Sequence, residues 1–199
     1  MLIVSKIREL KILDFDCEAR PLSWIGQDYV TKEPTAIAWK LIGSRGKPTV
    51  FVLGEVSSVE MLTKFVEAYN QADMVTGHYI RGFDLPLING ALSDWNLPPL
   101  QAKLTSDTKL DFFKRHGMSN SQESIGAMLN IKHEKISMTQ ADWRSANRLT
   151  KEGIRLTKVR VSGDVEQHIE MRDEILKRGW LGPPRVWDGE PSGTGKYHP

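Results

Sequence analysis

Alternating acids follow the first apolar stretch of the chain, where residues 11–18 read K-I-L-D-F-D-C-E. Because side chains alternate between the two faces of a strand, a strand here places its acids on one face, with Phe15 and Cys17 on the other. These acids are Asp14, Asp16 and Glu18. Carboxylates held this close repel one another unless a cation lies between them. Oxygen ligands favour Mg²⁺ or Mn²⁺. The pattern predicts a divalent-metal site, and the alternative is a strand end that emerges into solvent.

Two further aspartates follow predicted elements later in the chain. Asp84 ends the run G-H-Y-I-R-G-F-D, in which Gly77 and Gly82 permit a tight connection. The residues after it, L-P-L, predict a helix with Asp84 as its N-cap. Asp164 follows a Ser-Gly pair, and we expect it to open the final long helix near Gly163.

These three acidic regions resemble the motifs of the DEDD, or DnaQ-like, superfamily of 3′–5′ exonucleases, particularly the standalone exonuclease or proofreading domains of bacteriophages. The first motif is an apolar strand that ends in D-x-E, matched by I-L-D-F-D. The second is G-H-N followed by F-D, matched by G-H-Y-I-R-G-F-D with Tyr79 in place of the asparagine. The third is an aspartate within Y-x-x-x-D or H-x-x-x-x-D, matched in part by R-V-S-G-D-V. The matches cover roughly residues 7–178.

The resemblance implies an α/β single domain with an RNase H-like mixed sheet, flanked by helices, that carries four carboxylates and two Mg²⁺ or Mn²⁺ ions. Such ions lie roughly 3.5–4 Å apart and hold the attacking water and the leaving oxygen on opposite sides of one phosphorus. Asp14 would bridge both ions, Asp16 and Asp164 would complete the site nearest the nucleophile, and Asp84 would support the second ion through water. The residues expected to contact the substrate are Phe15, Tyr79 and Arg160. For Phe15 the alternative is core packing.

The chain also departs from the family pattern. Asp16 stands where the family has glutamate, and Glu18 on the same strand face is a candidate to assist. Arg160 stands where the family has a tyrosine that orients or deprotonates water, and arginine cannot act as a base at ordinary pH. An alternative third motif is His168 with Asp173, and a further alternative is that metal-bound water needs no side-chain base.

Apolar patterns predict the elements that must position these residues. Strands are expected at 12–18, 35–42, 49–53 and 74–76, with the second and third as an antiparallel hairpin beside the first. Residues 19–34 predict a loop, and residues 106–117 a short strand or helix. Helices are expected at 58–71, where Ser57 and Glu60 have capping-box spacing, at 121–129, and from about 163 to the stop signal at Gly179.

One domain is expected over residues 1–182, with a basic, partly helical insert at about 130–158 and a loose Gly- and Pro-rich tail at 183–199. We expect the basic insert to contact a phosphate backbone, and the alternative is the solvated face of an amphipathic helix. The net charge of +2 does not by itself indicate nucleic-acid binding.

Composition favours a cytoplasmic protein. The chain has 199 residues, of which 40% are hydrophobic and 26% charged. No apolar run approaches the roughly 20 residues of a membrane span, and the N-terminus lacks the pattern of a secretory signal. The single cysteine, Cys17, cannot form an internal disulfide.

The expected activity is metal-dependent 3′–5′ hydrolysis that removes nucleoside monophosphates from the 3′ end of single-stranded DNA, in DNA processing or in proofreading for a separate DNA polymerase. An exoribonuclease of the same fold is one alternative, because recognition of the 2′-OH depends on local pocket shape. A nucleic-acid-binding module with weak catalysis is another, suggested by Arg160 at the tyrosine position.

Overall fold

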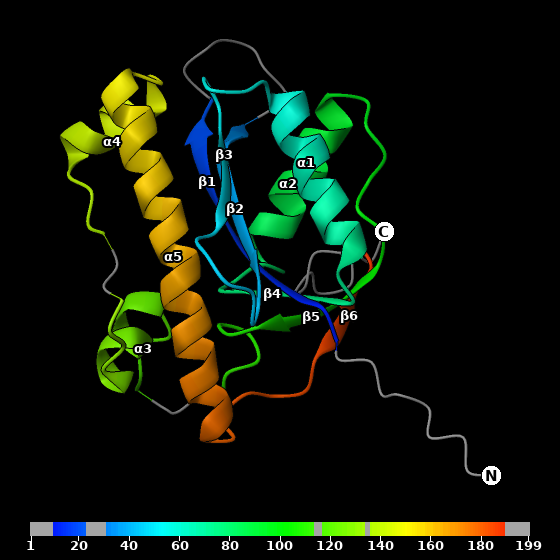
Figure 1. The fold of residues 1–199 in the computed structure, drawn as a ribbon, viewed down its shortest axis with the longest axis vertical. Coiled ribbons are helices and arrows are strands. Elements are labelled where there is room, and N and C mark those ends of the chain that lie inside the picture. The colour runs from blue at the N-terminus through cyan, green and yellow to red at the C-terminus, as the bar shows by residue number, and fades with distance from the viewer. Residues whose placement is uncertain (1–9, 23–30, 114–116, 134–135, 190–199) are drawn as a thin grey trace, which may run out of the picture.

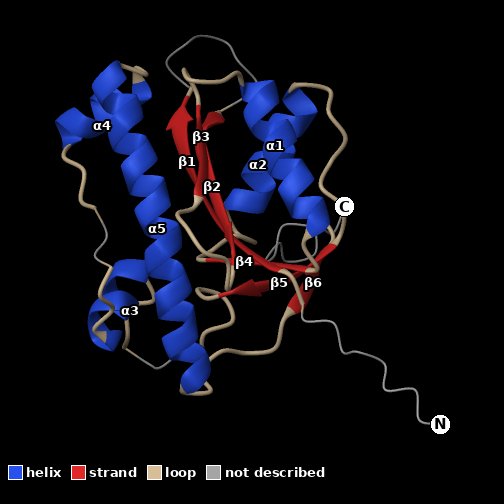
Figure 2. Cartoon of the chain, viewed as in Figure 1, coloured by secondary structure: helices blue, strands red, loops and turns tan. Residues whose placement is uncertain are grey.

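The computed structural model describes residues 10–22, 31–113, 117–133 and 136–189, in which five helices cover the two faces of a six-stranded sheet (Figure 1). The strands are β1 (Ile12–Pro21), β2 (Lys32–Leu41), β3 (Thr49–Val52), β4 (Met74–Gly77), β5 (Lys103–Asp107) and β6 (Arg185–Trp187). The helices are α1 (Ser58–Gln71), α2 (Asp84–Asp94), α3 (Gln122–Leu129), α4 (Gln140–Asn147) and α5 (Lys151–Lys177). Helices α1 and α2 lie on one side of the sheet and α3, α4 and α5 on the other (Figure 2).

The sheet is mixed and has the strand order β3-β2-β1-β4-β5-β6. β2 is antiparallel to both β1 and β3, so the predicted hairpin beside the first strand is confirmed. β1, β4 and β5 are parallel, and β6 is antiparallel to β5. The last β1 residue paired with β4 is Asp14, opposite Thr76, whereas β1 continues to Pro21. The second half of β1 therefore extends beyond the carboxyl end of β4, in the region where α/β sheets bind ligands.

Alternation along β1 gives the two faces different chemistry, as predicted. Leu13, Phe15 and Cys17 belong to the core beneath α1 and α2, where the Phe15 ring is 1% exposed and its centroid lies 4.9 Å from that of Phe65. This burial favours the core-packing interpretation of Phe15 over contact with a base. Full burial of such a side chain stabilises the fold by about 1.5–3 kcal/mol. The acids of β1 lie on the opposite face, toward α5.

Small side chains let α5 pack closely on the sheet. Ala36 and Ala38 of β2 are fully buried against Val161 and Val165 of α5. In the β1–β2 register, Asp16 lies opposite Ala38 and Glu18 opposite Ala36. The acids of β1 therefore share the face of the sheet on which α5 rests.

The start of the last helix was predicted wrongly. α5 begins at Lys151, not near Gly163, and its N-cap is Thr150, whose side chain accepts a hydrogen bond from the Gly153 N–H at 3.0 Å. The Ser-Gly pair before Asp164 resembles a helix start signal but lies inside α5. One glycine in a helix interior costs only about 1 kcal/mol, which the packing of a 27-residue helix outweighs. Asp164 therefore lies in the middle of α5.

Other predicted boundaries differ by shorter distances. The predicted helix at 58–71 is confirmed, with Ser57 as its cap, but the predicted loop at 19–34 is shorter because β1 and β2 both extend into it. β5 begins at Lys103, earlier than expected. β6 pairs with β5, so the sheet continues past residue 182 into the range predicted as a loose tail, and residues 190–199 of that range lie outside the described residues. Across the described ranges, no helix is both long and apolar enough to cross a membrane.

Candidate metal centre

The candidate metal centre lies where α5 packs along β1, with the two elements running antiparallel to each other. Four residues on a helix rise about 6.0 Å, and two residues on a strand rise about 6.6 Å, so side chains four apart on α5 can meet side chains two apart on β1. The contacts along the two elements are Arg160 with Glu18, Asp164 with Asp16 and Glu18, and His168 with Asp14.

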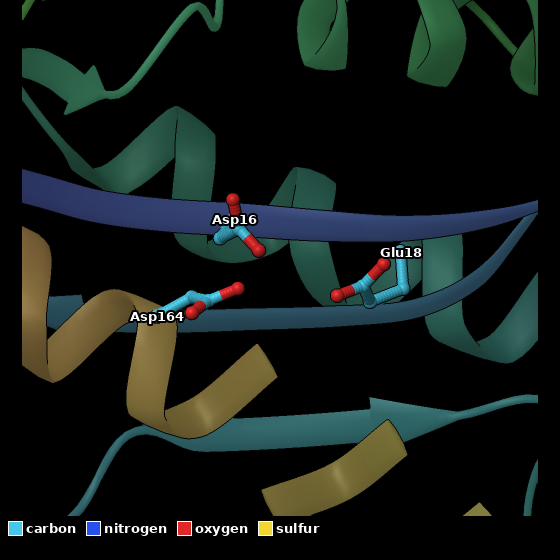
Figure 3. A group of neighbouring side chains, drawn as sticks. All are labelled: Asp16, Glu18 and Asp164. Atoms are coloured by element: carbon cyan, nitrogen blue, oxygen red, sulfur yellow. The ribbon is translucent and has the colours of Figure 1, made fainter. Parts of the chain in front are cut away.

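Three carboxylates gather at the middle of this contact. Asp16 and Glu18 come from β1 and Asp164 from α5, and one ligand oxygen of each lies within 4.8 Å of the others (Figure 3). The Asp164 side chain is 3% exposed and that of Glu18 is 13% exposed. Within the described residues, these three side chains form a group that can hold a metal ion. Carboxylate oxygens are the ligands that hard divalent cations prefer.

Two of the three acids on this face of β1 belong to the group. The group contains Asp16 and Glu18, whereas Asp14, expected from the sequence to bridge both ions, lies outside it. Glu18, the candidate to assist, is thus a member of the group. The signal was present in the sequence as D-C-E at 16–18, which overlaps D-F-D at 14–16. Alternation alone could not rank these two overlapping matches, because all three acids lie on one face.

Arg160 supplies a fixed positive charge beside the carboxylates. Its Nε donates to Glu18 Oε1 at 2.6 Å, its Nη2 lies 3.6 Å from Asp164 Oδ2, and its Nη1 donates to the Ile136 carbonyl at 2.5 Å. The guanidinium also lies over the Trp143 ring, 5.0 Å from the centroid. Burial lowers the pKa of Arg160, but the charges of Glu18 and Asp164 outweigh it and hold the pKa above its ordinary value. Arg160 is therefore a permanent cation of the site.

Asp14 of β1 is buried and contacts α5. Its Oδ2 lies 2.6 Å from His168 Nδ1, and its Oδ1 is buried with no hydrogen-bond donor among the described residues. Burial raises the pKa of Asp14, and the nearby His168 opposes this rise. His168 Nε2 in turn lies 2.8 Å from Thr108 Oγ1, which also contacts His78 Nδ1 at 3.0 Å. Both ring nitrogens of His168 are thus engaged and Asp173 is exposed, whereas Asp164 belongs to the acidic group.

Asp84 approaches β1 from the side of β4. It is the first residue of α2, and the N-cap is Phe83, so the predicted capping role is wrong. Instead, Asp84 Oδ1 accepts the N–H of Cys17 at 3.0 Å, on the part of β1 that extends beyond β4. Burial raises the pKa of Asp84 to about 7, although the Cys17 N–H opposes the rise. Since Cys17 lies between Asp16 and Glu18 in sequence, Asp84 is adjacent to the strand segment that carries the group.

The loop that precedes Asp84 is organised by Asp107 at the end of β5, a residue outside the predicted site. The Asp107 carboxylate accepts the backbone N–H groups of Tyr79 and Arg81, both at 3.0 Å. Tyr79 has a φ of 74°, and a Cβ at Gly82 would lie 2.3 Å from its ring, which explains the glycine. Tyr79 is 36% exposed, so it stays a candidate for substrate contact. A signal for Asp107 was its position at a strand end before a turn.

Comparisons with known proteins support the fold. No family model matches the chain, and no curated protein matches it in sequence. The structure is similar to that of the family B DNA polymerase from the hyperthermophilic archaeon Pyrobaculum calidifontis, with a TM-score of 0.63 and 16% sequence identity. The match covers 85% of this chain but only 25% of the polymerase chain. The fold is therefore an RNase H-like single α/β domain, as the sequence predicted.

Proposed function

We propose that this protein is a metal-dependent 3′–5′ exonuclease that removes nucleoside monophosphates from the 3′ end of single-stranded DNA. The observation that carries the proposal is the convergence of Asp16, Glu18 and Asp164 from two elements far apart in sequence, at the carboxyl edge of the parallel strands. The similarity to a quarter of a DNA polymerase is consistent with a match to that enzyme's 3′–5′ exonuclease domain, and it supports the same conclusion.

The residues present fit a divalent cation. Three carboxylates supply oxygen ligands only, which favours Mg²⁺ or Mn²⁺. When bound, such an ion lowers the pKa of a coordinated water and stabilises negative charge on a phosphate. Asp16, Glu18 and Asp164 would hold it. A second ion, supported by Asp84, remains a prediction.

Arg160 has a binding role in this proposal. Its guanidinium is held against Glu18 and Trp143, so it presents positive charge beside the carboxylates, where a phosphate of the substrate would lie. Because arginine stays protonated, it cannot deprotonate the attacking water. His168 is also unsuited to that task, because both of its ring nitrogens are engaged. The proposal therefore relies on the acidity of metal-bound water.

A second candidate function is nucleic-acid binding with weak or no hydrolysis. The observation that favours it is the ion pairing of Arg160 with Glu18 and Asp164, which already neutralises part of the charge that a metal ion would balance. Under this alternative, the acidic group binds metal poorly and the protein holds a strand without cutting it.

The test is digestion of matched DNA and RNA oligonucleotides that carry a 5′ label, with Mg²⁺, with Mn²⁺ and with EDTA. We expect stepwise shortening from the 3′ end that requires metal and prefers DNA. Loss of a residue that only hydrogen-bonds to a metal ligand typically lowers activity roughly 10–100-fold. A larger loss of turnover is expected when a carboxylate of the group is itself replaced, in Asp16→Asn, Glu18→Gln or Asp164→Asn. The matched control is Glu152→Gln, an exposed acid on α5 that pairs with Arg155.

Each result separates the candidates. Tight binding without shortening in either metal would favour the binding module, and shortening of RNA in preference to DNA would favour the exoribonuclease. Metal-dependent shortening that persists in all three carboxylate variants would overturn the assignment of the metal centre.

A further inference from the structure

Helix α4 presents a basic and aromatic stripe on its outer face. The residues that share this face line a hollow of about 490 Å³, and they are Gln140, Trp143, Arg144, Asn147 and Arg148. Their spacing of three, four, seven and eight residues from the first places them on one side of a helix. Ala146 of α4 is buried, and α4 packs against α5. The stripe therefore faces solvent.

The two arginines of the hollow differ from other cations nearby. Arg144 and Arg148 are exposed and form no ion pair with any residue that the structure describes. By contrast, Arg155 and Lys158 of α5 pair with Glu152 and Glu55. Arg144 and Arg148 are one helical turn apart, about 6 Å along the axis. They are thus available to an anionic partner.

The hollow is connected to the acidic group through Arg160 of α5. The Trp143 ring supports the Arg160 guanidinium, which bonds Glu18 of the group. Beyond Trp143, the Asn147 carbonyl accepts a hydrogen bond from Arg20 of β1 at 3.0 Å. The first contact reaches the second half of β1 through Arg160 and the second reaches it directly, so the hollow lies beside the metal centre.

We propose that the hollow on α4 binds single-stranded nucleic acid on the 5′ side of the nucleotide whose 3′ end lies at the metal centre. Arg144 and Arg148 bind its phosphates, and Trp143 contacts a base, since cationic grooves with aromatic side chains bind single strands without sequence preference. This inference rests on the proposed function for the position of the 3′ end. It gives α4 the role of orienting the strand.

The experiment measures binding separately from cleavage. The affinity of a 5′-fluorescein oligothymidylate is measured by anisotropy in EDTA, over a series of salt concentrations. Each phosphate contact to a single strand contributes about 0.7 to the slope of log affinity against log salt. The double variant Arg144→Gln/Arg148→Gln should therefore reduce the slope by about 1.4, and lower the affinity at least about tenfold.

Two further variants distinguish a local site from general electrostatics. Arg45→Gln/Lys47→Gln removes the same charge from the exposed turn between β2 and β3, at the other end of β2, and should leave the slope unchanged. Arg144→Lys/Arg148→Lys keeps the charge on α4 and should retain most of the slope. Equal losses in both glutamine variants, or an unchanged slope in the α4 variant, would overturn the proposal.

The outcome also separates this inference from the proposed function. If the α4 variant loses affinity while the wild-type protein cleaves no oligonucleotide in either metal, the nucleic-acid site stands and the exonuclease proposal fails. If the wild-type protein cleaves from the 3′ end and the α4 variant binds like wild type, the exonuclease proposal stands and the role of α4 is refuted.

Discussion

Replacing Arg160 with glutamine removes the fixed cation of the acidic group while keeping a polar, hydrogen-bonding side chain. In the wild-type protein this cation bonds Glu18 and lies close to Asp164, and the two side chains of the Arg160–Glu18 pair are 12% and 13% exposed. Without it, the three carboxylates have lost the positive charge that lies between the strand and the helix. We therefore expect lower stability without metal and a stronger response to metal.

The magnitude follows from the burial of the pair. Loss of one partner of a buried ion pair costs about 3–5 kcal/mol, whereas exposed pairs contribute about 0–1 kcal/mol. At 12–13% exposure the loss lies near the lower end of the buried range, about 3 kcal/mol. For a chain of 199 residues, 1 kcal/mol corresponds to about 2–4 °C, so the Tm in EDTA should fall by about 6–12 °C.

A divalent ion should recover part of this loss. An ion that binds only the folded state stabilises it by RT ln(1 + [L]/Kd), about 2.7 kcal/mol when its concentration is 100 times Kd. In the variant, the guanidinium no longer repels the ion or competes for Glu18. The rise in Tm on addition of excess Mn²⁺ should therefore be larger in Arg160→Gln than in wild type.

The assay is thermal unfolding followed by circular dichroism, in EDTA and in excess Mn²⁺, with Mn²⁺ affinity measured by calorimetry. Arg155→Gln is the control, because this arginine of α5 pairs with an acid at 61% and 60% exposure and should leave the Tm close to wild type. An Arg160→Gln protein as stable as wild type in EDTA, or one with no gain in Mn²⁺ affinity, would refute the view that Arg160 neutralises the group.

Two other predictions concern the loop that precedes Asp84. Burial raises the pKa of Asp84 to about 7 from 3.8, so the folded protein keeps a proton that the unfolded chain loses, and wild-type stability falls as pH rises through this window. Asp84→Asn has no carboxyl group to titrate, so its stability should not fall in this way. In EDTA, the free energy of unfolding of Asp84→Asn minus that of the wild-type protein should therefore increase as the pH rises from 3.8 to about 7. Urea unfolding at these two pH values measures the difference, and a difference that stays constant would contradict the raised pKa. Arg81→Ala removes the partner that lies 2.6 Å from Asp111, whose side chain is 1% exposed, and leaves the more distant Arg185 at 3.5 Å. The loss should therefore lie at the lower end of the range for a buried pair, about 3 kcal/mol. Urea unfolding measures the loss, and a double variant with leucine at both positions should recover most of it; a single variant as stable as wild type would show that the pair does not stabilise the loop.

The sequence by itself determined the local features of this protein. Helix α1 has the predicted bounds because its cap and its apolar spacing are both local signals. Acids at alternate positions must share one face of β1, whatever the rest of the chain does. The tight connection before Asp84 was also predictable from Gly77 and Gly82, and in the structure a Cβ at either position would lie 2.3 Å from the side chain of Ile80 or Tyr79.

Only the tertiary structure decided which acids meet. Which turn of α5 meets which residue of β1 depends on the packing of Val161 and Val165 against Ala36 and Ala38, contacts between residues more than 120 positions apart. That packing brings Asp164 to Asp16 and Glu18, and assigns Asp14 to His168. Local alternation fixes the face of a strand, but the register between a helix and a sheet is set by long-range packing, which no short sequence motif encodes.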